Sequence, residues 1–163
     1  MDRVNTIREI VDDLIEKITV EDWKDINIIK HNEITHTYGV ASFSRLLALK
    51  RGVDQDIALV IAYLHDVGRI ILNVMDSTHG EVCAVEAEKI LLKTKMFNDE
   101  EIKIITDAIR THTSKSTFGN DYDEIIKDAD VLERYLGNPS NFKEAVKKER
   151  LKKALSDLGV KVN

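Results

Sequence analysis

The adjacent pair His65 and Asp66 combines two metal-binding side chains inside an apolar stretch. Eight consecutive apolar residues, 57–64, precede the pair, and Val67 resumes the apolar character after it. We expect Asp66 to be at least partly buried, and an unpaired buried charge either costs several kcal/mol or shifts its pKa. A divalent cation would keep this carboxylate ionised, with His65 as a second ligand. The alternative is a helix-end pair satisfied by backbone amides or by an arginine such as Arg69.

Three further histidines have positions that suit the same chemistry. His36 and His112 each continue the apolar stripe of an expected helix, so their side chains should face the core. His79 lies at an expected junction between a loop and a helix. A single histidine on an apolar face is more often a hydrogen-bonded core residue than a metal ligand. Several such histidines beside a buried carboxylate are most simply explained by a shared divalent metal.

Apolar residues at helical spacing predict an all-α protein in which these histidines come from separate helices. The chain has one proline and seven glycines, and it contains no alternating pattern long enough to build a sheet. Residues 20–33 are mixed and predict a short helix or an ordered loop, and polar residues predict loops at 76–80 and about 111–121. The helices are expected at residues 3–19, about 33–50, after the N-cap Asp54 in a helix that carries residues 57–66, and at 81–93, about 98–113, 122–136 and 139–158, with a short apolar segment at 70–72.

Length and composition predict one globular domain. A chain of 163 residues with 43% hydrophobic and 33% charged residues is large enough to bury a core and is typical of soluble proteins. We find no repeat or linker that would divide residues 1–163. The apolar run at 57–64 is too short to cross a bilayer, and the chain does not open with a basic leader followed by an apolar stretch. We therefore expect neither a membrane span nor a secretion signal.

The net charge and the cysteine content limit which binding partners and which cellular compartment we expect. The formal net charge of −5 argues against a surface for duplex nucleic acid. One cysteine, Cys83, excludes an internal disulfide and suits a reducing compartment. We therefore expect a cytoplasmic protein that does not bind membranes. The sequence leaves the oligomeric state open.

Four of these residues stand in a pattern that resembles the H…HD…D signature of the HD-domain superfamily. They are His36, the doublet His65 and Asp66 within LHDVG, and Asp130 within KDADVL. The resemblance covers about residues 33–136, and residues 139–158 would add a C-terminal helix. It implies an all-α HD-domain helical bundle that holds one or two divalent ions, such as Mn, Mg, Co, Ni or Fe. Because most members hydrolyse phosphoester bonds, it implies a metal-dependent phosphohydrolase that acts on a small phosphorylated metabolite or nucleotide.

The resemblance also implies roles for the remaining histidines. Some HD subfamilies hold a second ion with two extra histidines between the doublet and the final aspartate, and His79 and His112 lie in that interval. A bound ion lowers the pKa of water and polarises a phosphoryl group, so His65 and Asp66 are the expected catalytic positions. The implied metal ligands are His36, His65, Asp66, His79, His112 and Asp130.

Two aspartates compete for the last ligand position. Helical spacing puts Asp128 and Asp130 on nearly opposite faces, so we do not expect both to bind one ion. The apolar stripe places Asp128 slightly closer to the core, whereas the family pattern selects the aspartate that follows alanine, which is Asp130. We follow the family pattern and keep Asp128 as the alternative.

The sequence lacks motifs that characterise several HD subfamilies, which limits the subfamilies to which it could belong. No GYP element follows His112, which counts against a cyclic di-GMP phosphodiesterase, and the KLADRLHN-like run of alarmone hydrolases is absent. The sequence also lacks the glutamate shortly after the doublet that nucleoside 5′-monophosphate hydrolases of this superfamily use. Two alternatives remain, namely an HD-type di-iron oxygenase with the same six ligands and a non-catalytic HD ligand-binding module. The cations expected to meet substrate phosphate are Arg69, Lys115 and Arg134, although each could instead be an ion-paired surface residue.

Overall fold

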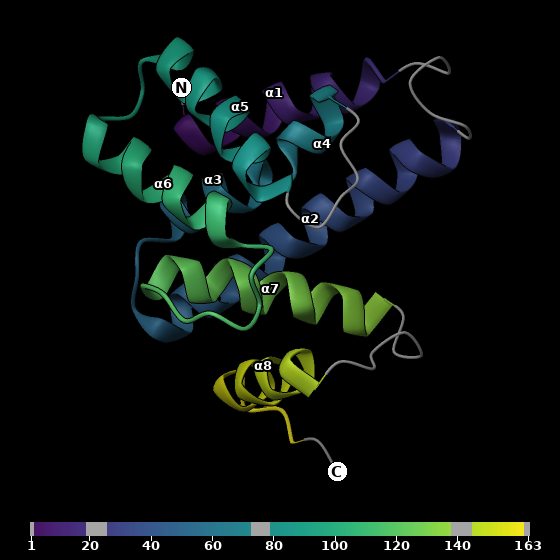
Figure 1. The fold of residues 1–163 in the computed structure, drawn as a ribbon, viewed down its shortest axis with the longest axis vertical. Coiled ribbons are helices and arrows are strands. Elements are labelled where there is room, and N and C mark those ends of the chain that lie inside the picture. The colour runs from purple at the N-terminus through teal and green to yellow at the C-terminus, as the bar shows by residue number, and fades with distance from the viewer. Residues whose placement is uncertain (1, 19–25, 73–78, 138–144, 162–163) are drawn as a thin grey trace.

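The structure, a computed structural model, describes residues 2–18, 26–72, 79–137 and 145–161. Within these ranges the chain forms eight α-helices and no strand, which confirms the expected all-α fold (Figure 1). No helix in this part of the chain combines the length and the apolar character needed to cross a membrane. The helices are α1 (Arg3–Glu16), α2 (Ile26–Arg51), α3 (Gln55–Leu64), α4 (Val67–Leu72), α5 (His79–Thr94), α6 (Asp99–Thr111), α7 (Asp121–Gly137) and α8 (Ala145–Asp157).

Two helices, α2 and α5, show clear differences between the predicted and the observed start. α2 begins at Ile26 instead of about residue 33, because no proline or glycine interrupts residues 26–33. α5 begins at His79, two residues before the predicted start. Of the predicted C-terminal helix, residues 145–157 are helical as α8. Residues 138–144 and most of the predicted loop at 76–80 lie outside the described residues.

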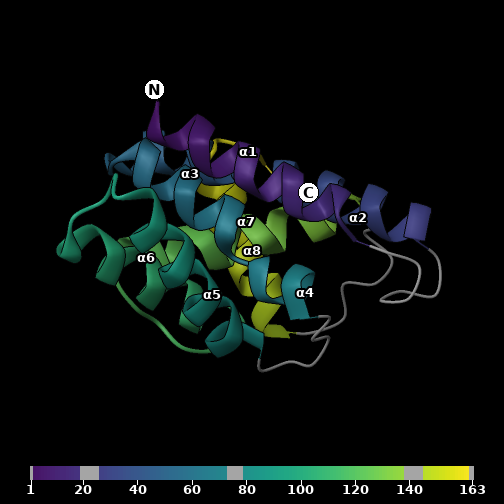
Figure 2. The same ribbon diagram turned by 90° about the horizontal axis from the view of Figure 1, so that it is seen from above.

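α3 lies at the centre of the helical bundle. It packs against α1, α2, α6 and α7, whereas α5 packs against α4 and α6, and α8 packs against α7 (Figures 1 and 2). The apolar run 57–64 is buried except for the partly exposed Leu59 and Tyr63. Because this buried helix ends inside the core, the two residues that follow it are buried as well. His65 is 1% exposed and Asp66 is 2% exposed.

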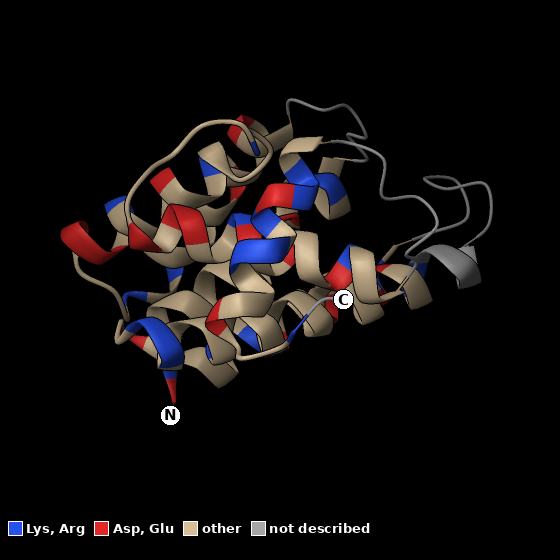
Figure 3. Ribbon diagram, turned by 90° about the horizontal axis from the view of Figure 1, so that it is seen from below, with Lys and Arg blue, Asp and Glu red and all other residues tan. Residues whose placement is uncertain are grey.

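Buried ion pairs join α8 to α7 and α2. Asp128 of α7 is fully buried and accepts hydrogen bonds from Arg51 of α2 at 2.6 Å and from Arg150 of α8 at 3.0 Å. Arg150 also donates to Glu124 at 2.8 Å. Such partners are required because the desolvation of a buried carboxylate is otherwise not offset. Seen from the α8 end, stretches of basic and of acidic residues lie close together on the neighbouring helices (Figure 3).

Replacing Arg150 by alanine should lower the free energy of unfolding by about 3 kcal/mol, because it removes a partner from two buried carboxylates. Urea denaturation followed by circular dichroism measures the change. The matched control is Lys152→Ala, which removes an exposed pair with Glu149 on the same helix and should change stability by less than about 0.5 kcal/mol. Equal effects of the two substitutions would contradict the anchoring role of Arg150.

Candidate metal centre

Six side chains from five helices or their ends converge near the middle of the bundle. No two of the histidines share a helix, so only the packing of the helices brings them together. His36 comes from α2, His65 and Asp66 from the end of α3, His79 from the first residue of α5, His112 from the end of α6, and Asp130 from α7.

Four histidine nitrogens face the two oxygens of one carboxylate, in two pairs. The Nε2 atoms of His36 and His65 lie 3.2 Å apart, and they are 3.6 Å and 3.5 Å from Asp66 Oδ2. The Nε2 atoms of His79 and His112 also lie 3.2 Å apart, and they are 3.0 Å and 3.4 Å from Asp66 Oδ1. Each pair, taken with Asp66, forms a group of ligand atoms close enough to hold one metal ion.

Two of these histidines are oriented by the same local device. α3 and α6 end earlier than predicted, so His65 and His112 are C-cap residues instead of helical ones. Nδ1 of His65 donates to Ala62 O, and Nδ1 of His112 donates to Ile109 O, both at 2.7 Å. Because a carbonyl oxygen only accepts, Nδ1 carries the hydrogen in each ring, and the neutral ring presents a lone pair at Nε2.

His36 is oriented by a carboxylate from another helix. Its Nδ1 lies 2.5 Å from Glu133 Oε2 of α7, and this partner assigns the hydrogen to Nδ1. The Nε2 atoms of His36 and His65 then face each other as two acceptors, which repel unless a cation or a proton lies between them. Burial lowers the pKa of His65 to about 3, so a proton is disfavoured at that position. The donor set fits a divalent metal ion.

Asp66 provides a second sign of a cation site. Its Oδ1 is buried and accepts no hydrogen bond of ordinary geometry, although His79 and His112 lie close to it. Burial by itself raises the pKa of this carboxyl, but the imidazoles of His65, His112 and His79 together with the Arg69 guanidinium hold the pKa well below its usual range. A buried carboxylate oxygen without a donor is an expected ligand for a metal ion.

Arg69 is bound to Asp66 itself. Its Nη1 donates to Asp66 Oδ2 at 2.6 Å, and its Nη2 lies 3.4 Å from Oε1 of the buried Glu33. The arginine partner considered from the sequence is therefore present, but it reaches only one of the two carboxylate oxygens. Because a carboxylate oxygen has two acceptor sites, Oδ2 can accept from Arg69 and still face the histidine pair.

Of the two competing aspartates, the structure places Asp130 at the histidines. Asp130 Oδ1 is 3.4 Å from His36 Nε2, whereas Asp128 points toward Arg51 and Arg150. Burial raises the pKa of Asp130, but Lys115 at 2.5 Å and Arg134 at 2.8 Å outweigh this effect and hold the pKa well below its usual range. The binding of a metal ion by Asp130 stays a prediction.

Two carboxylates near the site were missed by the sequence analysis. Glu133 lies three residues after Asp130, and Glu33 lies three residues before His36. Residues at this spacing share a helix face, and that was the available signal. In the structure Glu133 bonds His36 and Glu33 pairs with Arg69, so both hold other site residues in place.

Gly80 lets α5 begin close enough to α6 to bring His79 beside His112. A Cβ atom at Gly80 would lie 2.5 Å from the backbone oxygen of Arg110, a distance that side chains do not tolerate. The glycine next to His79 is thus required by the close approach of the two helices.

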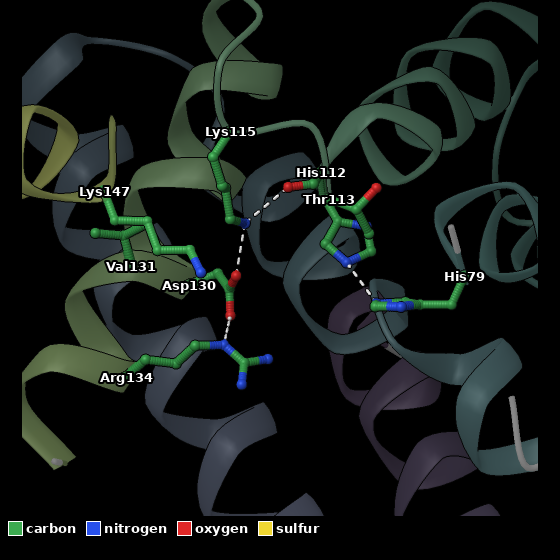
Figure 4. A pocket seen from close by; sticks show the side chains of 8 residues that line it. All are labelled: His79, His112, Thr113, Lys115, Asp130, Val131, Arg134 and Lys147. Atoms are coloured by element: carbon green, nitrogen blue, oxygen red, sulfur yellow. Dashed lines mark hydrogen bonds and ion pairs between the residues drawn. The ribbon is translucent and has the colours of Figure 1, made fainter. Parts of the chain in front are cut away.

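A cavity of about 200 Å³ opens beside the histidines. Lys115 and Arg134 reach Asp130 from two sides of it, and Lys115 also donates to the backbone oxygen of His112 at 2.7 Å (Figure 4). Arg69, the third cation predicted to meet phosphate, is not among the lining residues. Among the residues that the structure describes, the cavity is lined by His79, His112, Thr113, Lys115, Asp130, Val131, Arg134 and Lys147.

Comparisons with known proteins identify the family of the chain. The model of the HD domain family matches residues 34–135, close to the range of 33–136 expected from the motif. The chain is 32% identical over 113 residues to a protein of Clostridium beijerinckii described as uncharacterized, an alignment that covers 68% of this chain and 69% of the relative. No solved structure matches the chain.

The purified chain saturated with Mn²⁺ should bind about two ions, and His112→Ala should bind about one, because each ion needs its own histidine pair. Metal analysis after removal of unbound ions measures the ratio. His31→Ala changes an exposed histidine of α2 outside the cluster and should leave the ratio unchanged. One ion in the unaltered chain would leave His79 and His112 as residues of the cavity wall.

Glu133→Gln should weaken metal binding about tenfold without unfolding the chain, because residues that orient a ligating histidine typically contribute 10- to 100-fold to affinity. Titration with Co²⁺, followed by its absorption, measures the affinity. Glu88→Gln, an exposed position on α5, is the control with the same change of charge. Equal affinities of all three proteins would show that Glu133 does not orient a ligand.

Proposed function

The chain belongs to the HD-domain family, and from this membership we propose that it is a metal-dependent phosphohydrolase of a small phosphorylated metabolite or nucleotide. The observation that carries the proposal is the meeting of two histidine pairs on the two oxygens of Asp66, beside a cavity lined by cations. Histidine and carboxylate ligands suit a divalent ion, and cationic side chains suit a phosphate group.

Two overlapping sets of residues would hold the ions. His36, His65 and Asp66, together with Asp130, would form one set, whereas His79, His112 and the other oxygen of Asp66 would form the second. When bound, the ions lower the pKa of water and polarise the phosphoryl group. Asp66 would be shared by both sets and His65 belongs to the first set. We therefore propose these two residues as the catalytic positions.

The residues around the cavity have the chemistry needed to hold the substrate. Lys115 and Arg134 would donate hydrogen bonds to phosphate oxygens while keeping Asp130 ionised. Arg134 is 49% exposed on its side chain, so it can turn toward a ligand at little cost, whereas Lys115 is buried and held between Asp130 and the backbone of His112. Arg69 would act on the site through Asp66, since it does not line the cavity.

Two other functions are compatible with these residues. The same six ligands could hold the two irons of an oxygenase, and the cavity could bind a ligand in a protein that catalyses no reaction. The cations of the described lining suit the phosphate-bearing substrate that a phosphohydrolase requires. The di-iron and binding-module alternatives are therefore outcomes that an experiment must separate.

The chain loaded in turn with Mn, Mg, Co, Ni or Fe should release phosphate from a member of a panel of phosphorylated metabolites and nucleotides. Removal of the metal by a chelator should abolish release. Asp66→Asn and His65→Ala should each lower kcat/KM more than about 100-fold, since even outer partners of metal ligands contribute 10- to 100-fold. His31→Ala should retain full activity.

Two other outcomes would refute the proposal. A pair of bound irons with a mixed-valent signal and dioxygen consumption would identify an oxygenase. Failure to bind any metal after reloading would identify a binding module.

A further inference from the structure

A second cavity lies between helices α1, α2 and α3. Its volume is about 300 Å³, at the lower end of the range of about 300–1,000 Å³ for small-molecule sites. The three helices pack against one another at one surface of the bundle (Figure 2). The described residues that line this cavity include none of the metal centre and none of the cavity beside the histidines. A ligand bound here would therefore occupy a separate site.

The walls of this cavity are stripes of residues at helical spacing. Residues three and four positions apart share one face of a helix, so each stripe is a continuous face. α3 contributes Leu59 and Tyr63, which also pack against the hydrophobic core. The geometry of the walls is therefore set by the packing of the helices. The stripe from α2 consists of Tyr38, Ala41, Ser42 and Arg45.

Three hydrogen-bond donors from three different helices line the cavity, namely Arg8 of α1, Arg45 of α2 and Tyr63 of α3. Burial raises the pKa of the Tyr63 phenol, and the guanidiniums of Arg8 and Arg45 both counteract this effect, so both lie near it. Within the described part of the chain, the one hydrogen bond that these three groups make runs from Arg45 Nε to Gln55 Oε1, at 3.4 Å. Their other N–H groups and the hydroxyl can therefore donate to a ligand.

Tyr38 holds the ring of Tyr63 in place. The two ring centroids lie 5.7 Å apart and the rings meet edge to face, at 77°. The hydroxyl of Tyr38 donates to the carboxylate of Asp12, with its oxygen 2.9 Å and 2.8 Å from the two carboxylate oxygens. Because Tyr38 is engaged in this way, Tyr63 is the tyrosine of this pair whose hydroxyl is left for a ligand.

Two carboxylates also line the cavity. Asp2 is the N-cap of α1 and accepts hydrogen bonds from the backbone of Val4 and the side chain of Asn5, both at 3.0 Å. Asp56 precedes Tyr63 by seven residues, which separates the two positions by about 10 Å along α3. An anion bound at Tyr63 would thus lie apart from Asp56, and a hydroxyl group of the same molecule could donate to that carboxylate.

We propose that this cavity binds a phosphate group, free or carried by a small molecule, through Arg8, Arg45 and the hydroxyl of Tyr63. Two guanidinium forks and a hydroxyl offer more donors than the two oxygens of a carboxylate can accept in good geometry, whereas a phosphate has additional oxygens. The inference does not depend on the proposed hydrolysis, because no residue of the metal centre takes part.

The test is an NMR titration of the Mg²⁺-loaded, ¹⁵N-labelled chain with inorganic phosphate, glycerol phosphate and acetate at pH 7. The amide signals of Ser42 and Leu59 should shift to saturation with both phosphates, and acetate should bind at least about tenfold more weakly. Tighter binding of glycerol phosphate would identify a phosphorylated molecule as the ligand, and equal or tighter binding of inorganic phosphate would identify the free ion.

Arg8→Gln, Arg45→Gln and Tyr63→Phe should each weaken phosphate binding about tenfold, the effect of one lost hydrogen bond to a charged group. Circular dichroism verifies that each variant keeps its helices. Lys50→Gln is the matched control, because it removes a positive charge from an exposed position of α2 outside the cavity. Its affinity should stay within about twofold of that of the unaltered chain, as screening predicts for an exposed charge.

The titration also separates this site from the metal centre. Shifts at Thr113 and Lys115 would report phosphate in the cavity beside the histidines, and the three variants should leave those shifts unchanged. Shifts confined to Thr113 and Lys115, full affinity in all three variants, an equal loss in Lys50→Gln, or equal binding of acetate would each overturn the inference.

Discussion

The candidate site depends on one interaction: four imidazole nitrogens lie within 3.6 Å of the two oxygens of one buried carboxylate. In water such a group would be unremarkable, but here Asp66 is 2% exposed and one of its oxygens has no hydrogen-bond donor. The Nε2 atoms of His36 and His65, which lie 3.2 Å apart, add a further unfavourable contact where both act as acceptors. A divalent cation would relieve both costs at once, which is why we propose one for this group.

The histidines and Asp66 are brought together because several helices begin or end at the site. α3 is apolar and buried, and it stops inside the core, so His65 and Asp66 emerge where no solvent reaches. α6 stops one residue before His112, and α5 starts at His79. At both C-caps the imidazole donates to a carbonyl of the last turn, and this bond directs Nε2 toward Asp66. The same bonds serve the fold and the site.

α7 carries a residue with structural ion pairs on one face and a residue of the candidate metal site on the other. Asp128 faces α2 and α8, where two arginines neutralise it and fasten the C-terminal helix. Asp130, two residues later, faces the histidines and the cavity. The C-terminal helix is then bound on one side through Asp128 and lines the cavity on the other through Lys147. A helix outside the family match thus becomes part of the cavity wall.

The sequence by itself determined the fold class, the helical stripes and the residue types of the site, because helical periodicity depends on local spacing and the HD signature on residue types in a fixed order. His36, His65 and Asp66 could be chosen in this way. The family pattern selected Asp130 over Asp128, but only the tertiary structure shows which atoms meet, since both carboxylates are buried. It also decided the roles of the ion-paired and cavity-lining residues, because an ion pair such as that of Glu133 with His36 joins positions 97 residues apart. Distances of this kind are set by how helices pack, which no local pattern encodes.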